Sequence, residues 1–261
     1  MIPLKDDIPT RRFPVLTVAI IVACCAVYFL WQHGGWELGD TGNERVLEYG
    51  AIPYEITHPG KSCGQTSTGE IACEGQSGVS GKAPDQAVWW ITLFTSMFMH
   101  GSLLHLAGNM LFLWIFGNNI EDSMSPWRFA LFYVLGGLAA LGAQVLTDPS
   151  ATVPTVGASG AIAGVLGAYA LLYPRARVIT VVFIIIFFTV IELPALLVLG
   201  FWILIQLFLG ANDLASPAQG AEGGVAYFAH IGGFAFGLLA IRLFANRVQD
   251  DYERSHRLPV Y

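Results

Sequence analysis

This sequence has few charged residues. Asp, Glu, Lys and Arg together make up 12% of its 261 residues, about half the share that is usual in soluble domains. Hydrophobic residues make up 54%, and several apolar runs reach the ~20 residues that cross a bilayer. The chain has no basic block of the kind that binds nucleic acid, so we expect no nucleic-acid partner. The composition indicates a protein that crosses a membrane several times.

The N-terminus lacks the features of a cleavable signal peptide. The apolar run after residues 1–12 is too long, and no small-x-small cleavage site follows it. We expect residues 1–12 to be a short tail before the first span. The expected spans that the apolar runs define directly lie at about residues 15–31, 102–118, 129–146, 159–173 and 225–244. Residues 178–210 could hold one further span or two.

The basic residues between the spans decide this question. With six spans and a cytoplasmic N-terminus, ten Lys and Arg lie inside and three outside, as the positive-inside rule requires. A seventh span would move the four C-terminal arginines outside. We therefore expect residues 178–191 to be a buried or interfacial connector and residues 193–210 to be the fifth span. The inside set is Lys5, Arg11, Arg12, Arg128, Arg175, Arg177, Arg242, Arg247, Arg254 and Arg257; the outside set is Arg45, Lys61 and Lys82.

Cysteine is also scarce, and the four cysteines form two pairs. Cys24 and Cys25 are adjacent inside the first span, where we interpret them as packed or lipid-facing apolar residues. Cys63 and Cys73 lie in the polar loop of residues 32–85, whose middle has no apolar period and is expected to be flexible. If this loop faces an oxidising compartment, a disulfide between Cys63 and Cys73 is expected.

Polar side chains within the spans are few, and such residues usually face the protein interior. His105 and Asn109 are four residues apart on the second span and therefore share a helix face. Ser159 opens the fourth span, and His230 lies near the start of the last one. In the six-span topology these three spans run from outside to inside. All four side chains then lie at one depth, near the outer surface.

Small residues follow Ser159 and His230 at helical spacing. Such strips let membrane helices approach closely, so two packed strips would bring the hydroxyl of Ser159 to the imidazole of His230. That pairing is the core of a nucleophile–base arrangement, because imidazole takes up a proton near neutral pH. The strips are Ser159, Ala163 and Gly167 on one span and His230, Gly233 and Gly237 on the other.

Several other kinds of site are missing from the sequence. The spans hold no Asp or Glu to orient His230, so the arrangement would be a dyad. The histidines lack metal-ligand spacing, and we expect no metal or cofactor. The segment GASGA is not the G-x-S-x-G elbow of soluble hydrolases, because Ala161 occupies its last position.

Each of these polar residues, taken alone, has a structural explanation. A serine at a helix start is most often an N-cap, and an asparagine in a span usually helps helices to pack. A histidine in a span more often bridges two helices than reacts. Only the convergence of four polar residues at one depth favours a reaction site.

At these residues the chain resembles the rhomboid family of intramembrane serine proteases. The segment GASG, residues 157–160, is similar to the family's nucleophile motif, and AHIGGFAFG, residues 229–237, resembles its A-H-x-x-G-x-x-x-G motif. The segment HGSLLHLAGNMLFLWIFG, residues 100–117, is similar to the family's second span. The similarity extends from about residue 13 to residue 246, and the motifs occur in the same order as in the family.

The resemblance implies a role for each matched residue. Ser159 would be the nucleophile and His230 the general base, while His105 and Asn109 would join the backbone N–H of Ser159 in binding the oxyanion. Glu121 matches an acidic residue that helps to fix the loop below the second span. The motif glycines expected to support the site are Gly157, Gly160, Gly233 and Gly237.

Three features depart from the family pattern. Some rhomboids have a Trp-Arg pair just before the second-span histidines, where this chain has Ile91 and Thr92. Some stack an aromatic ring on the base from four positions after the nucleophile, where this chain has Ala163; Tyr227 or Phe228 is an alternative source of that ring. The outer loop carries an insertion at about residues 59–84 that we do not match to the family.

We therefore predict an all-α membrane protein, a rhomboid-like bundle of six transmembrane helices with both termini in the cytoplasm. Residues 13–246 would form the membrane core, with the long outer loop at residues 32–85. Residues 1–12 and 247–261 would be cytoplasmic tails. We expect the protein in the cell (inner) membrane.

The predicted activity is that of a serine endopeptidase whose Ser159–His230 dyad hydrolyses peptide bonds in or next to transmembrane segments of other proteins. Its partners would be those substrates and the membrane lipids. One alternative is an inactive rhomboid-like protein that binds membrane clients, although such a relative would be expected to lack Ser159 or His230. A transporter is disfavoured, because the spans show no internal repeat and the polar residues lie off the midplane.

Overall fold

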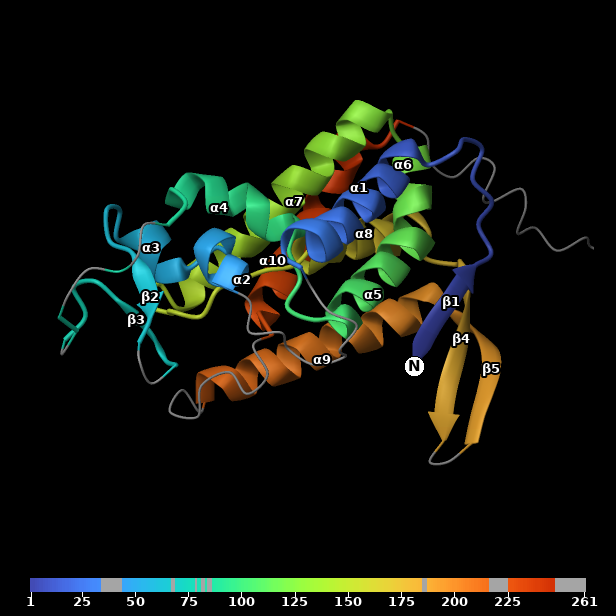
Figure 1. Ribbon diagram of the computed structural model, residues 1–261. Helices are drawn as coiled ribbons and strands as arrows, with labels where there is room; N and C mark the ends of the chain where they lie inside the picture. The colour runs from blue at the N-terminus through green and yellow to red at the C-terminus, as the bar shows by residue number, and fades with distance from the viewer. Residues whose placement is uncertain are drawn as a thin grey trace, which may run out of the picture.

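The computed structural model describes residues 1–33, 44–66, 69–77, 79–80, 83, 86–184, 187–215 and 225–246. The predicted C-terminal tail, residues 247–261, lies outside the described residues, as do parts of the outer-loop insertion. The described chain is mostly helical, with one small sheet at each end of a helical bundle (Figure 1).

The apolar runs form the helices of the bundle. In the described part of the chain, four helical stretches are long and apolar enough to cross a membrane, and two further apolar stretches are shorter. The long ones are α5 with its continuation through a π-helical turn into α6 (Leu103–Asp122), α7 (Pro126–Thr147), α9 (Ala195–Ala215) and α10 (Tyr227–Phe244). The shorter ones are α1 (Val15–Ala26), extended by a π-helical turn to Trp31, and α8 (Ser159–Leu172).

The helix α8 lies at the centre of the bundle, with α7 and α10 packed against it (Figure 1). Of its 14 residues, 11 are buried. A helix that is apolar on all sides must be surrounded by other elements or by lipid, and here the surrounding elements are helices. By contrast α9 packs mainly against α10 and leaves much of its apolar surface exposed.

The described part of the loop of residues 32–85 holds short elements that the sequence analysis did not anticipate. Helices α2 (Glu44–Tyr49) and α3 (Pro53–Thr57) precede an antiparallel hairpin of β2 (Cys63–Gln65) and β3 (Ile71–Cys73), and α4 (Trp89–Thr95) leads back to the bundle. Cys63 and Cys73 face each other in the hairpin and form a disulfide. Their side chains are buried with those of Ile52 and Tyr54. The expectation of a flexible middle was therefore wrong for these residues, because a covalent link and a small apolar cluster hold them.

The all-α expectation also needs correction. The strands β1 (Ile2–Asp6), β4 (Arg177–Ile184) and β5 (Phe187–Pro194) form an antiparallel sheet in the order β1-β4-β5. The described residues of the expected connector, 178–184 and 187–191, lie in the paired strands β4 and β5, and β5 is exposed along nearly its whole length. The connector is therefore not buried. The segment is rich in β-branched and aromatic residues, which favour strands.

The strand β1 is held in place by a buried carboxylate. Asp6 accepts hydrogen bonds from the amide of Asn119 and, at 2.6 Å, from the hydroxyl of Tyr169. Burial raises the pKa of Asp6 to about 6, although the hydrogen bond from Tyr169 opposes that shift. Part of the expected N-terminal tail is therefore docked on the bundle.

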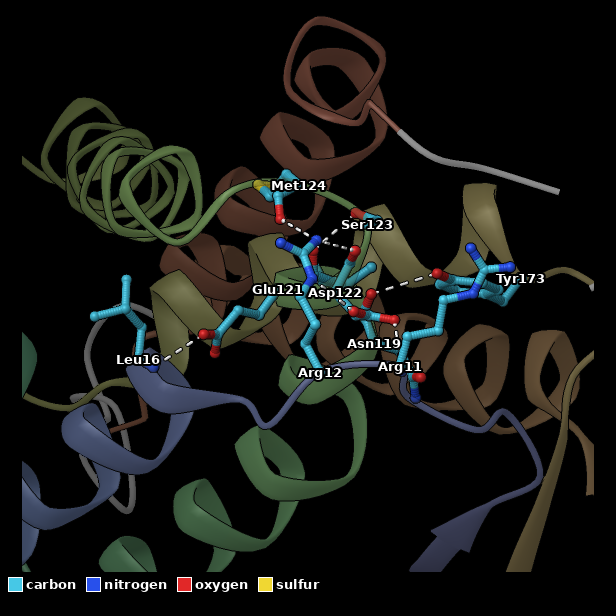
Figure 2. Close-up of polar contacts among 10 residues, drawn as sticks. Arg11, Arg12, Leu16, Asn119, Glu121, Asp122, Ser123, Met124 and Tyr173 are labelled. Carbon is cyan, nitrogen blue, oxygen red and sulfur yellow. Dashed lines mark hydrogen bonds and ion pairs between the residues drawn. The ribbon is translucent and has the colours of Figure 1, made fainter. Parts of the chain in front are cut away.

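A second carboxylate joins the end of α6 (Asn118–Asp122) to the start of α1. Glu121 accepts a hydrogen bond from the backbone N–H of Leu16 at 2.9 Å (Figure 2). It also accepts hydrogen bonds from the backbone N–H of Thr17 at 2.7 Å and from the Thr17 hydroxyl at 2.8 Å. The first N–H groups of a helix have no partner within the helix, and a negative charge there also complements the helix dipole. Close by, Asp122 forms an ion pair with Arg12 at 3.4 Å (Figure 2).

Candidate active site

Ser159 and His230, which are 71 positions apart in the chain, meet at one end of the α8–α10 contact. The Nε2 atom of His230 lies 2.8 Å from the Oγ atom of Ser159. Ser159 is the first residue of α8, and His230 lies in the first turn of α10. The hydroxyl and the imidazole are within hydrogen-bonding distance, as a nucleophile and its base must be.

The close approach of α8 and α10 depends on glycine. A Cβ atom added to Gly233 would collide with the carbonyl oxygen of Gly160, and one added to Gly237 would collide with that of Gly164. The backbones of the two helices are therefore in direct contact, as the small-residue strips predicted. Of the expected strip of Ser159, Ala163 and Gly167, Gly167 lies in this contact, since a Cβ atom there would lie 2.1 Å from the carbonyl oxygen of Phe234. The α8 backbone that Gly233 and Gly237 meet comes from Gly160 and Gly164, one position along from Ser159 and Ala163.

Gly157 shapes the turn that leads into α8. Its φ of +125° is one that residues with a side chain rarely adopt. A Cβ atom there would also lie 2.7 Å from Nε2 of His105. The backbone N–H of Gly157 donates to the carbonyl of Ser96 at 2.8 Å, which ties this turn to the segment before α5. Glycine at this position thus lets the His105 ring lie beside the turn that carries Ser159.

The helix α5 (Leu103–Phe112) supplies His105 and Asn109. Ser102 is its N-cap, and the Oγ atom of Ser102 accepts a hydrogen bond from the N–H of His105 at 3.1 Å. Asn109 is 8% exposed. Its Nδ2 atom is buried and has no hydrogen-bond partner among the residues that the structure describes. A buried donor without a partner costs free energy, so this amide is available to a ligand.

All four predicted polar residues line one cavity of about 750 Å³. Ser159, His230, His105 and Asn109 therefore face a shared space, with helices α5, α7, α8, α9 and α10 contributing to its wall. The loop of residues 32–85 contributes as well, because Gln65 of β2 and Ile71 of β3 also line the cavity. The disulfide hairpin is thus part of the same site region.

The sequence analysis missed a residue on α9. The Oε1 atom of Gln206 lies 2.7 Å from Nδ1 of His230, on the opposite side of the imidazole from Ser159. Gln206 is 7% exposed, although most of its neighbours on α9 face outward. The signal was present in the sequence, because Gln206 is the only amide side chain in the predicted fifth span and polar groups within spans usually face the interior.

The ring beside His230 also comes from α9. Trp202 lies with its ring centroid 5.5 Å from that of His230, at an interplanar angle of 41°. Tyr227 and Phe228, the expected sources, lie instead against Gly210 of α9. Trp202 and Gln206 are four residues apart and share a helix face.

A comparison with protein families decides what this chain is related to. Residues 87–247, which is more than half of the chain, match the model of the Rhomboid domain. The chain belongs to the rhomboid family. Rhomboids are generally intramembrane serine proteases, although some rhomboid-like members are inactive. The match covers Ser159, His230, His105, Asn109 and Gln206.

Similar proteins come from fungi, bacteria and plants. The chain is 31% identical over 153 residues to Rhomboid protein 1, mitochondrial, of Saccharomyces cerevisiae, covering 57% of this chain and 40% of that protein. It is 33% identical over 155 residues to Rhomboid protease GluP of Bacillus subtilis, covering 59% of this chain and 24% of that protein. It is 30% identical over 174 residues to RHOMBOID-like protein 1 of Arabidopsis thaliana, covering 66% of this chain and 38% of that protein.

These matches have two consequences for the rhomboid described here. The family and the apolar helices make it an integral membrane protein. The matched segments span less than half the length of each of these three relatives. The relatives differ in cellular setting, and one of them is mitochondrial by name, so the particular membrane does not follow from the match.

Proposed function

We propose that this rhomboid is an intramembrane serine endopeptidase that cuts other membrane proteins in or next to their transmembrane segments. The observation that carries the proposal is the 2.8 Å contact between Ser159 Oγ and His230 Nε2 at the wall of a cavity. In this mechanism Ser159 attacks the scissile carbonyl while His230 takes its proton. His230 then returns the proton to the leaving amine, and water releases the acyl group in a second, equivalent step.

The short length of α8 supports a site below the membrane surface. Its 14 residues span about 21 Å at 1.5 Å per residue, less than the ~30 Å of the hydrocarbon core. A helix of this length can begin several ångströms inside the outer face, and Ser159 is its first residue. Hydrolysis there requires water, which the cavity and its polar lining would admit.

The depth of Ser159 in the membrane also indicates where the substrate is cut. A transmembrane segment is helical because its backbone groups have no other partners in lipid, whereas a protease needs an extended backbone at the cut. We therefore propose that cleavage falls near the outer end of the substrate's span, where water and protein groups replace the lost hydrogen bonds.

We further propose six transmembrane helices with both termini in the cytoplasm and the loop of residues 32–85 outside. The membrane core would be residues 13–246, flanked by tails at 1–12 and 247–261, in the cell (inner) membrane. The ten-to-three division of Lys and Arg supports this orientation. Reporter fusions at Tyr261 and near Gly75 are expected to report the inside and the outside respectively. A C-terminal reporter active only outside would contradict the topology.

The oxyanion would be bound by three donors: the backbone N–H of Ser159, Asn109 and His105. The N–H of Ser159 is at the start of α8, where helix N–H groups lack helical partners. The Nδ2 atom of Asn109, which has no hydrogen-bond partner in the described part of the chain, and the position of His105 beside Gly157 support the two side-chain assignments. Such donors stabilise the transition state because they are in place before charge develops.

Asn109→Ala is therefore expected to lower kcat by about 10²–10³-fold, with a small change in KM. The reason is that the donor acts on charge that exists only in the transition state. The measurement is steady-state cleavage of a single-span substrate in detergent or liposomes. Trp114→Leu serves as the control, because Trp114 lies on the continuation of the same helix, is 50% exposed and does not line the cavity. Equal rates for the two variants would remove Asn109 from the oxyanion site.

The decisive experiment is to reconstitute the purified full chain with a single-span membrane substrate and to follow cleavage by gel and mass spectrometry. A fluorophosphonate probe is added in a parallel sample, because it reports an activated serine without any need for a substrate. We expect cleavage near the outer end of the substrate span and labelling at Ser159. If the wild-type chain shows no cleavage and no labelling, it is an inactive rhomboid that binds clients.

A further inference from the structure

We infer that Gln206 is a third member of the catalytic arrangement, a positioning residue that sets the tautomer and the orientation of His230. The inference rests on the proposed protease function and extends it. The observation behind it is that the two nitrogens of one imidazole have different partners. Nε2 lies 2.8 Å from Ser159, and Nδ1 lies 2.7 Å from Oε1 of Gln206.

The orientation of the Gln206 amide follows from its second contact. Its Nε2 atom donates to the backbone carbonyl of Trp202 at 3.5 Å. A carbonyl oxygen only accepts hydrogen bonds, so the nitrogen of the amide must face it. The amide oxygen is then left to face His230. This argument assigns the oxygen and nitrogen of the amide from the hydrogen-bond network.

The tautomer of His230 follows in turn. An amide oxygen only accepts, so Nδ1 of His230 must carry the proton that is shared with Gln206. In the neutral ring Nε2 then has a free lone pair, directed at the hydroxyl of Ser159. This is the form that a general base needs, and the opposite tautomer would present an N–H to Ser159.

Gln206 thus takes the orienting place that a carboxylate has in the Ser-His-Asp triad. A neutral amide suits this position because an uncompensated charge is costly to bury, and the buried residues of α9 in the described chain include no Asp or Glu. Trp202 on the same face of α9 covers the ring of His230 from the side. Helix α9 therefore supplies both contacts that hold the imidazole, while α8 and α10 supply the reacting pair.

The test compares Gln206→Met with Gln206→Glu. Methionine has a similar length but no strong acceptor, whereas glutamate keeps an oxygen at the same position. We expect Gln206→Met to lower kcat by roughly 10- to 10³-fold. This range lies between the effect of losing one neutral hydrogen bond and the effect of losing an orienting carboxylate on kcat. KM should be unchanged, and the rate of fluorophosphonate labelling at Ser159 should fall by the same factor. Gln206→Glu should retain clearly more activity than Gln206→Met.

Two controls separate positioning from packing. Leu207→Met places the same side chain on the neighbouring, 46% exposed position and should behave as wild type. If Gln206→Met does not fold, Gln206→Asn keeps an amide that is one methylene too short to reach Nδ1, and it should show the same selective loss of kcat. A folded Met or Asn variant with wild-type kcat and labelling would overturn the inference while the protease function stands. A wild-type chain that neither cleaves nor labels would overturn both.

Discussion

Replacing Ser159 by alanine is expected to abolish cleavage and probe labelling together. The nucleophile and the base act as a unit, so removal of either one should lower kcat by about 10⁴-fold or more. His230→Ala should give a loss of similar size, and the double variant should be no worse than either single one. The reason is that without the imidazole the hydroxyl of Ser159 is not activated, and without the hydroxyl the imidazole has nothing to activate.

The measurement is cleavage of a single-span substrate, with fluorophosphonate labelling mapped by mass spectrometry. Ser150→Ala is the matched control, because Ser150 is an exposed serine that does not line the cavity. The thermal stability of Ser159→Ala should stay close to wild type, since a single partly buried hydroxyl contributes about 1 kcal/mol. If Ser159→Ala retained more than a trace of cleavage, the dyad would not be the source of the activity.

Gly237→Ala is expected to produce a large structural effect from a single added carbon. The new Cβ atom would collide with the carbonyl oxygen of Gly164, and neither backbone can move aside without separating α8 from α10. Overpacking of this kind typically costs about 1–3 kcal/mol of unfolding free energy. Cleavage should fall as well, by ~10²-fold if the helices separate by about 1 Å, because the same contact holds Ser159 against His230.

The control for Gly237→Ala is Gly142→Ala on α7. A Cβ atom at Gly142 would meet nothing within 4 Å in the described structure, so the change should be neutral or should stabilise the helix by up to ~1 kcal/mol. Unfolding in a denaturing detergent and thermal scans measure both variants. Equal stability of the two would mean that α8 and α10 are not in direct backbone contact.

The positions of the helices could be predicted from local sequence. Long apolar runs such as residues 126–147 and 227–244 form helices, because an uninterrupted apolar segment has few other ways to satisfy its backbone. The strips of small residues also predicted that α8 and α10 pack together. Small residues at every third or fourth position let the backbones of two membrane helices approach closely.

The candidate site was predicted in part, from polar residues that are costly within a membrane. Ser159, His230, His105 and Asn109 line one cavity. Gln206 meets the same criterion, but it was overlooked because the search for an orienting group considered only carboxylates. An amide can orient the imidazole without a buried charge, so the residue type of Gln206 did not by itself indicate that role.

Tertiary structure decided the remaining features. Residues 178–191 are an apolar run that fits a strand or a helix by composition, and pairing with β1 makes β4 and β5 a sheet. The pairing of Gln206 with His230 depends on where α9 packs, and this helix has apolar residues on all sides. Gln206 is the one polar residue in the predicted span, and it marks a face of the helix but not the partner which that face meets. Only contacts with α10 direct Gln206 and Trp202 toward the imidazole, because they bury the one face that bears a polar group.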